Sequence, residues 1–268
     1  MTGRPTVAVV GAGLAGLSVA SALAGDHRVT VLDRLPAPGG VLGYDHPAVV
    51  EVARDCRAGG VTSLLGTTAL RWAKHRLLAA GPQGIEWLPA DHLVFAGGAR
   101  PALPAELGLL GPRVAGVYGA PVAIHLGEAG VSMGREVCVV GVGDWAARAI
   151  HHLTHAGAHV TGVSPADGDP PPYGDGWWMG WRAVAYEGVR RVTAVVVARG
   201  ASRERITCDT LVLAGDSRPL RNVDGAITPT AGVTFAQRIS DAQTIEEVRD
   251  DSLAIANRIR DTQGSAAR

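Results

Sequence analysis

The feature that most constrains this chain is a glycine-rich turn near the N-terminus, GAGLAG, which begins at Gly11. A short apolar run, TVAVV, precedes it, and a segment with a helical apolar face follows it. Between a strand and a helix, Gly11 permits the tight turn, Gly13 lets the backbone approach a pyrophosphate, and Gly16 lets the helix pack on the strand. The amide groups of the first helical turn, which includes Leu14 and Ala15, attract phosphate. The pattern predicts a nucleotide-binding unit.

The next apolar run, VTVLD, ends on an acidic residue, Asp33. An acid about 20 residues after the first glycine of such a turn accepts a hydrogen bond from an adenosine ribose hydroxyl. We therefore assign Asp33 to a ribose and place its neighbour Arg34 in the same site. Strand, glycine turn, helix and acid together form one βαβ unit.

The same pattern recurs in the second half of the chain. REVCVV reads as a strand, GVGDWA as a glycine-rich turn, ARAIHHLTHAG as a helix and HVTGV as a strand, which indicates an internal duplication. The second turn departs from the first, because it carries an acid and a bulky aromatic residue, and its second strand ends without an acid or an arginine for a ribose. Either a dinucleotide binds here, or the unit is kept for packing. The residues of this second candidate site are Gly141, Gly143, Asp144, Trp145 and Ala146.

Composition excludes several classes of protein. The chain has 268 residues, of which 47% are apolar and 19% charged, enough for one large or two modest domains. Lys+Arg and Asp+Glu both number 25, which argues against nucleic acid or an anionic membrane as the main partner. No apolar stretch approaches the ~20 residues of a membrane span, and no signal-peptide pattern precedes the first strand. We expect a cytoplasmic protein.

The order of motifs resembles the flavoprotein oxidoreductases with two dinucleotide-binding domains, the group that includes thioredoxin reductase. The resemblance rests on GAGLAG…VTVLD, GG at 39–40, DHLVFAGGARP and GVGDWA. It implies an α/β fold of two Rossmann-like domains, the second inserted in the first. The split FAD-binding domain would span 1–112 and 221–268, and the inserted NAD(P)-type domain 113–220.

The resemblance also implies site residues, position by position. Gly11, Gly13 and Gly16 would contact the FAD pyrophosphate, and Asp33 the ribose. The glycine pair and the turn after LVF would line the same cofactor, through Gly40, Ala96, Gly97, Gly98 and Arg100.

A narrower resemblance lies in the connecting segment GVYGAPVAIHLGEAGVSMGREVCVVGVG. It is similar to the FAD-containing subunits of amino-acid and amine dehydrogenase or oxidase complexes, such as hydrogen cyanide synthase B, opine oxidase A, sarcosine oxidase α and proline or hydroxyproline dehydrogenase α. This implies a hetero-oligomer in which a partner chain oxidises a small amino-acid or amine substrate. Thioredoxin reductase itself is disfavoured, because Cys138 stands without the second cysteine of a redox pair.

The sequence departs from this family at its third FAD segment. The family reads like G-V-x-x-A-G-D, whereas this chain reads GVTFAQR, with Gln237 for the glycine and Arg238 for the aspartate. Three alternatives stay open. Asp241 takes the role after a local shift, Gln237 and Arg238 bind the pyrophosphate in another way, or the chain has lost tight FAD binding.

The sequence thus predicts an FAD-dependent oxidoreductase, with FAD as cofactor and NAD(P) as a second candidate. The alternatives are a self-contained NAD(P)H-dependent flavoprotein reductase and a nucleotide-binding scaffold subunit that has lost FAD. No catalytic residue is assigned from spacing. No metal site is expected, because His151, His152 and His155 share a helix without an acidic or cysteine partner nearby. The aromatic group of Trp177, Trp178 and Trp181 forms either a partner or ligand surface or part of the core.

Overall fold

The computed structural model describes residues 3–220, 223, 231–236 and 244–266, the side chains of 263–266 excepted. The chain divides into two compact units, residues 1–99 with 219–268, and residues 100–218. Each unit has its own parallel sheet and its own apolar core.

The sheet of the first unit has five parallel strands in the order β18-β7-β1-β2-β3. The strands are β1 (Thr6–Val10), β2 (Arg28–Asp33), β3 (Thr62–Leu65), β7 (His92–Phe95) and β18 (Val233–Phe235). From β1 the chain proceeds first to one side, through β2 and β3, and later returns to pair β7 on the other side. Ligands of such sheets bind at the carboxyl ends of the strands where the order reverses, which here is the end of β1.

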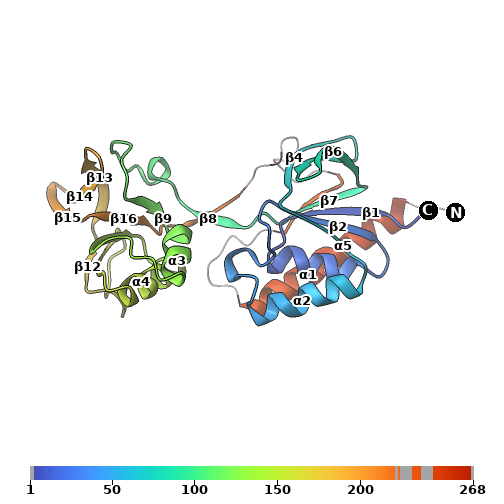
Figure 1. Ribbon diagram of the computed structural model, residues 1–268, viewed down its shortest axis with the longest axis horizontal. Helices are drawn as coiled ribbons and strands as arrows, with labels where there is room; N and C mark the ends of the chain where they lie inside the picture. The colour runs from blue at the N-terminus through green and yellow to red at the C-terminus, as the bar shows by residue number, and fades with distance from the viewer. Residues whose placement is uncertain (1–2, 221–222, 224–230, 237–243, 267–268) are drawn as a thin grey trace. The chain divides into compact units, whose positions relative to one another are not determined.

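Different layers cover the two faces of this sheet (Figure 1). On one face, α1 packs between α2 and α5, and on the other lies an antiparallel three-stranded sheet, β4-β5-β6. Strands β1 and β7 are buried on both faces, which explains their continuous apolar sequences. The covering elements are α1 (Leu14–Leu23), α2 (Pro47–Ala58), α5 (Ile245–Ala266), β4 (Thr68–Ala73), β5 (Arg76–Gly81) and β6 (Gly84–Pro89), with a short 3-10 helix η1 (Gly40–Leu42).

The second unit repeats this architecture, as the duplicated motif predicts. Its parallel sheet has the order β12-β11-β10-β16-β9, with α3 and α4 on one face and the antiparallel sheet β13-β14-β15 on the other. The sheet strands are β9 (Val117–Gly119), β10 (Glu136–Val140), β11 (His159–Ser164), β12 (Gly176–Met179) and β16 (Thr210–Leu213). The others are α3 (Ala120–Glu128), α4 (Asp144–His155), β13 (Arg182–Gly188), β14 (Val192–Arg199), β15 (Ser202–Thr207) and the 3-10 helix η2 (Pro104–Leu107).

The chain passes between the units twice, and the two passages pair as strands β8 (Ala99–Pro101) and β17 (Ser217–Pro219). The sequence places residues 100–112 in the first domain, whereas in the structure they group with the second unit. Leu109 is buried in the core beside β14, and the Leu110 amide donates to the Val184 carbonyl. These contacts are remote in sequence, so no local pattern marks them.

Two further elements complete the description of the fold. The aromatic segment containing Trp177 forms β12, an edge strand that pairs in parallel with β11. The C-terminal helix α5 ends at Ala266. A loop rich in proline and glycine separates β12 from its parallel partner β11 in the sequence. The local sequence of β12 alone therefore does not identify it as a strand.

Candidate nucleotide-binding site

The turn between β1 and α1 has the backbone that its glycines predict. Gly11 has a φ of 110°, and a Cβ there would lie 2.2 Å from the Ala96 carbonyl oxygen. A Cβ on Gly16 would lie 2.0 Å from the Gly11 carbonyl oxygen. Glycine is therefore required at both positions for the strand, turn and helix to pack.

Gly13 is different, because the protein's own packing does not require it. Its backbone is extended, and the nearest atom to an added Cβ, the Gly40 Cα, would be 3.9 Å away. Gly13 is the N-cap of α1, so no side chain caps this helix, and its first turn contains no acidic residue. An exposed helix N-terminus of this kind favours an anion. A side chain at Gly13 would fill the space that a phosphate needs, so the turn fits a pyrophosphate.

Asp33 lies at the carboxyl end of β2 with its carboxylate held in place. The Ala12 amide donates to Oδ2 at 2.7 Å, and the Leu35 amide donates to Oδ1 at 2.9 Å. Each oxygen retains a second lone pair, and the side chain is partly exposed. The two fixed oxygens can accept from the vicinal hydroxyls of a ribose.

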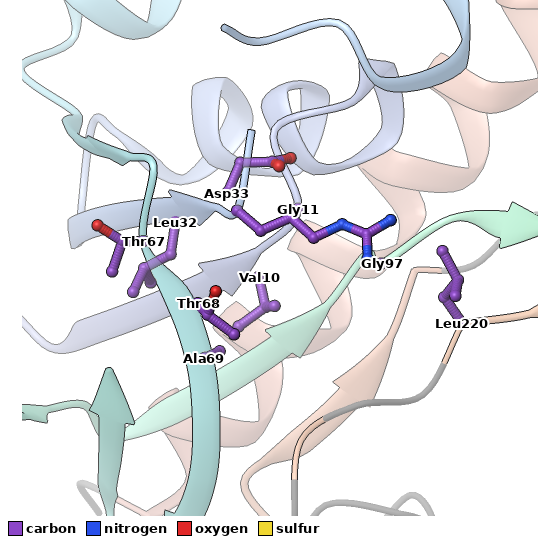
Figure 2. A pocket seen from close by; sticks show the side chains of 10 residues that line it. Val10, Gly11, Leu32, Asp33, Thr67, Thr68, Ala69, Gly97 and Leu220 are labelled. Carbon is purple, nitrogen blue, oxygen red and sulfur yellow. The ribbon is translucent and has the colours of Figure 1, made fainter. Parts of the chain in front are cut away.

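A cleft joins the turn and the acid at the carboxyl edge of the sheet. Figure 2 shows Asp33 above Leu32, with Thr67 and Thr68 on one side and Gly97 on the other. The sequence prediction identified four of the lining residues, and the full set is Val10, Gly11, Leu32, Asp33, Arg34, Thr67, Thr68, Ala69, Gly97 and Leu220. The cleft has the place and the lining expected for an adenosine.

The structure adds residues that the sequence prediction missed. Thr67 and Thr68 enter the site because the chain turns after β3, and the Thr67 amide donates to the Asp33 carbonyl at 2.8 Å. Leu220 is brought in by its amide, which donates to the Gly98 carbonyl at 2.9 Å. In the sequence, only the pair of threonines shortly after the strand β3 could have indicated Thr67 and Thr68. No local sequence pattern points to Leu220.

Several other predicted residues shape the turn without lining the cleft. The Leu14 side chain is buried in the core, so only its backbone is available to a ligand. The Ala15 carbonyl accepts from Ser252 of α5 at 3.3 Å. A Cβ on Gly40 would come within 3.2 Å of the Gly13 Cα, and Ala96 packs its backbone against Gly11. These residues shape the turn through their packing.

Arg100, which the resemblance places beside the cofactor, pairs with an acid of the second unit. Its guanidinium forms a two-point ion pair with Glu106, at 2.6 and 2.9 Å, and also donates to the Pro101 carbonyl. Bonding to Arg100 lowers the pKa of Glu106 to about 2. The charge of Arg100 is therefore engaged inside the second unit. Two further predicted residues, Gln237 and Asp241, lie outside the described residues, as does Arg238.

The second glycine-rich turn lies between β10 and α4. Gly141 repeats Gly11, because its added Cβ would be 2.2 Å from the Ala214 carbonyl oxygen. Gly143 is the N-cap of α4, and the exposed Asp144 begins the helix. Trp145 is buried with Ala146, and its indole N–H donates to the Ser217 hydroxyl at 2.9 Å. The tight turn at the first glycine is thus retained, whereas Gly143 has a φ of 91° where Gly13 has a φ of −76°, and an acid begins the helix.

The remaining candidate clusters have structural roles. Trp177 and Trp178 pack against the two cores of the second unit, and Trp178 stacks edge-on against Trp181 at 5.1 Å. His151 and His155 lie ring to ring on α4 at 4.3 Å. In the part of the chain that the structure describes, no three His, Cys, Asp or Glu residues are grouped to hold a metal ion. Over the same residues, no helix has the length and apolar character to cross a membrane.

Comparison with known proteins agrees with this geometry. Residues 9–52 match a family model described as "NAD(P)-binding Rossmann-like domain", and residues 132–223 match one described as "Putative NAD(P)-binding". Each model covers less than half of the chain. No curated protein sequence matches the chain.

Solved structures show the same fold at low sequence identity. An NAD-dependent persulfide reductase from A. fulgidus superposes with a TM-score of 0.67 at 19% identity, over 95% of this chain and 58% of that chain. An L-proline dehydrogenase from P. horikoshii gives 0.67 at 17% identity, over 98% and 57%. A thioredoxin reductase from Lactococcus lactis gives 0.67 at 15% identity, over 95% and 97%. The chain therefore spans little more than half the length of the first two.

Two glycine-rich turns, two five-stranded parallel sheets and these superpositions lead to the same conclusion. The chain has two Rossmann-like domains, which match models of NAD(P)-binding domains, and the two-domain fold of the FAD- and NAD(P)-dependent oxidoreductases.

Proposed function

We propose that this chain is an FAD-dependent oxidoreductase that serves as the flavoprotein subunit of an amino-acid or amine dehydrogenase or oxidase complex. The observation that carries the proposal is the first unit's site. There the Asp33 carboxylate is fixed by two backbone amides, beside a helix N-terminus with no side-chain cap. This arrangement suits the adenosine and pyrophosphate of a dinucleotide cofactor.

FAD, when bound, supplies hydride and electron transfer through its isoalloxazine ring. The residues of this chain hold and orient the cofactor. The first-turn amides of α1 would hold the pyrophosphate, and Asp33 would accept from the ribose hydroxyls. Because the Asp33 oxygens are held at 2.7 and 2.9 Å by the backbone, little side-chain freedom is lost on binding.

The narrower assignment rests on the connecting segment from Gly116 to Gly143. That segment resembles the FAD-containing subunits of amino-acid and amine dehydrogenases, and one of the similar structures is a proline dehydrogenase. The resemblance implies that a partner chain oxidises the substrate in such complexes, and the proposal assigns the substrate site to that partner.

The second candidate is a self-contained NAD(P)H-dependent flavoprotein reductase, favoured by the family match over residues 132–223. The residue of the second unit that corresponds to Asp33 argues against this second candidate. Leu32 pairs with Val10 in the first sheet, and Val163 pairs with Val140 at the same place in the second sheet. Asp33 follows Leu32 and Ser164 follows Val163, so Ser164 is the counterpart of Asp33. Ser164 is fully buried, and its hydroxyl accepts from the Ala166 amide at 3.1 Å.

The test is the absorption spectrum of the purified full chain, followed by acid release and identification of the nucleotide. We expect bands near ~370 and ~450 nm, the signature of a protein-bound oxidised flavin, together with released FAD. A colourless protein that also fails to take up added FAD would contradict both flavoprotein assignments and favour the scaffold alternative. Reduction of the bound flavin by NADH or NADPH alone would favour the second candidate.

The Asp33→Asn variant locates the cofactor. The amide NH₂ of asparagine would face one of the two backbone donors, which removes an acceptor from the ribose. We expect the FAD affinity to fall about tenfold, as for the loss of one charge-assisted hydrogen bond. Asp250→Asn, at an exposed position on α5, is the matched control and should bind as the parent does.

A further inference from the structure

The two units correspond residue by residue where the chain passes from the parallel sheet into the antiparallel sheet. In the first unit the Thr67 amide donates to the Asp33 carbonyl at 2.8 Å, and in the second the Trp181 amide donates to the Ser164 carbonyl at 3.0 Å. Each of these amides follows a glycine with a left-handed backbone, whose φ is 66° in the first unit and 75° in the second. Trp181 is therefore the counterpart of Thr67, and Ser164 is the counterpart of Asp33.

The strands that follow, β4 and β13, continue this correspondence. Ala69 and Ala183 are both buried, and in both strands the pairing with the next strand becomes irregular directly after this alanine. The residue before the alanine is Thr68 in the first unit and Arg182 in the second. Arg182 thus takes the position of Thr68, which lines the first unit's cleft together with Asp33.

The charge at this place differs between the two units. The first unit has the carboxylate of Asp33 beside the neutral Thr68, whereas the second has the neutral Ser164 beside the cationic Arg182. The Trp181 side chain packs on the core of its unit. The side chain of Arg182 is exposed, and within the described part of the chain no acid pairs with it. Its guanidinium is therefore available to an anion.

Two further arginines lie around Arg182. Ala198 of β14 pairs with Arg182 on one side and with Arg203 on the other, so both arginines lie on one face of the sheet, about 10 Å apart. Arg199 follows Ala198 and forms an exposed ion pair with Asp167 at 3.7 Å. These groups, three arginines and one acid, favour an anion at this end of the sheet.

The type of charge at this place selects the ribose in nucleotide-binding units of this kind. An acid accepts a hydrogen bond from the 2′-hydroxyl of NADH, whereas an arginine accommodates the 2′-phosphate of NADPH. We propose that the second unit binds the 2′-phosphorylated form, NADPH, in preference to NADH, and that Arg182 is the residue that selects it. Arg182 comes from β13, so the loop sequence directly after Ser164, which contains no arginine, does not reveal it.

The inference goes beyond the proposed function, whose flavin site lies in the first unit. It concerns only residues of the second unit, so it stands whether or not FAD is bound. It assigns no reductase activity, because a contact with the phosphorylated ribose does not place a nicotinamide beside a flavin.

The test is calorimetric titration of the full chain with 2′,5′-ADP and with 5′-AMP, which differ only in the 2′-phosphate. The protein is first saturated with FAD, and its flavin absorbance reports on the first unit separately. We expect 2′,5′-ADP to bind at least about tenfold more tightly than 5′-AMP, as for a two-point contact between an arginine and a phosphate. Equal affinities, or no binding of 2′,5′-ADP, would overturn the proposal.

Variants of the arginine assign the contact to one residue. Arg182→Gln should lower the affinity for 2′,5′-ADP about tenfold and leave the affinity for 5′-AMP unchanged. Arg182→Lys keeps the charge without the two-point geometry and should restore part of the affinity. Arg190→Gln is the matched control, because it removes the same charge from an exposed position in the turn after β13, at the other end of that strand. An unchanged affinity in Arg182→Gln, or an equal loss in the control, would refute the role of Arg182.

Discussion

Single residues decide whether the first nucleotide turn can form. Gly11 combines a φ of 110° with a carbonyl oxygen 2.2 Å from the position of a Cβ. Neither the backbone strain nor the close contact can be relieved by a side-chain rotation, since both partners are main chain. The turn, and with it the placement of Asp33, therefore depends on this position.

We expect Gly11→Ala to lower the free energy of unfolding by about 3 kcal/mol, through left-handed strain and overpacking. Urea denaturation measures this change. Gly25→Ala is the matched control, because no atom lies within 4 Å of its added Cβ. An unchanged midpoint in Gly11→Ala would mean that the turn adopts another backbone.

A buried histidine makes stability depend on pH. His92 of β7 is only 7% exposed, and its Nε2 lies 2.9 Å from the Thr234 hydroxyl. Burial, with a smaller contribution from His27, lowers the pKa of His92 to about 4. The folded protein therefore keeps this ring neutral, whereas the unfolded chain binds a proton at its ordinary pKa of about 6.5.

Stability should consequently be constant above about pH 6.5 and fall as the pH drops from there toward about 4, by up to about 3 kcal/mol. Urea denaturation across this range measures the slope. In His92→Gln the slope should flatten, whereas in His159→Gln, an exposed histidine, it should persist. An equal slope in parent and His92→Gln would assign the acid sensitivity to other groups.

Among the elements, α5 shows how a distant segment completes the first unit. It packs along α1, where Ser252 bonds to Ala15 and Arg260 bonds to Asp26 at 2.8 Å. Its N-terminus has a capping box, in which the Glu247 amide donates to the Thr244 hydroxyl at 3.2 Å and Glu247 accepts from the Thr244 amide at 2.7 Å. The cap sets where the helix begins.

Loss of the cap should destabilise the first unit. We expect Thr244→Ala to lower the free energy of unfolding by about 1 kcal/mol, because an amide of the first turn loses its acceptor. Calorimetry measures the effect. Glu246→Ala, an exposed acid of the same turn outside the box, should change stability less. A larger loss in the control would indicate that helix charge matters more than the cap.

At the scale of the whole molecule, each unit buries its own core. Residues 100–218 form one continuous stretch, whereas the first unit is assembled from two pieces of chain. Independent cores on both faces of each sheet satisfy the requirement for autonomous folding.

We therefore expect residues 100–218, expressed alone, to fold and to unfold in one cooperative transition followed by circular dichroism. Residues 1–99 alone lack α5 and β18 and should not do so. A non-cooperative transition of the 100–218 segment would show that its core depends on the rest of the chain.

The sequence alone determined the general form of this protein. Local patterns in the sequence indicate the two glycine turns, the apolar strands on either side of them and the apolar faces of the helices. Steric limits on the backbone determine the turns, and burial of one helix face determines the helical pattern. From them follow the two Rossmann-like units and the placement of Asp33 beside Gly11. Local rules suffice for these features, because each depends on residues within one βαβ unit.

Only the tertiary structure decided which side chains meet at each turn. Thr67 and Leu220 reach the cleft of the first unit, and Arg100 pairs with Glu106 in the second. The physical reason is that these side chains come from loops and strand ends. There the sequence has no hydrophobic periodicity from which the direction of a side chain could be predicted. Such segments come together only when the sheet has folded. For this reason the two glycine-rich turns have different neighbouring residues.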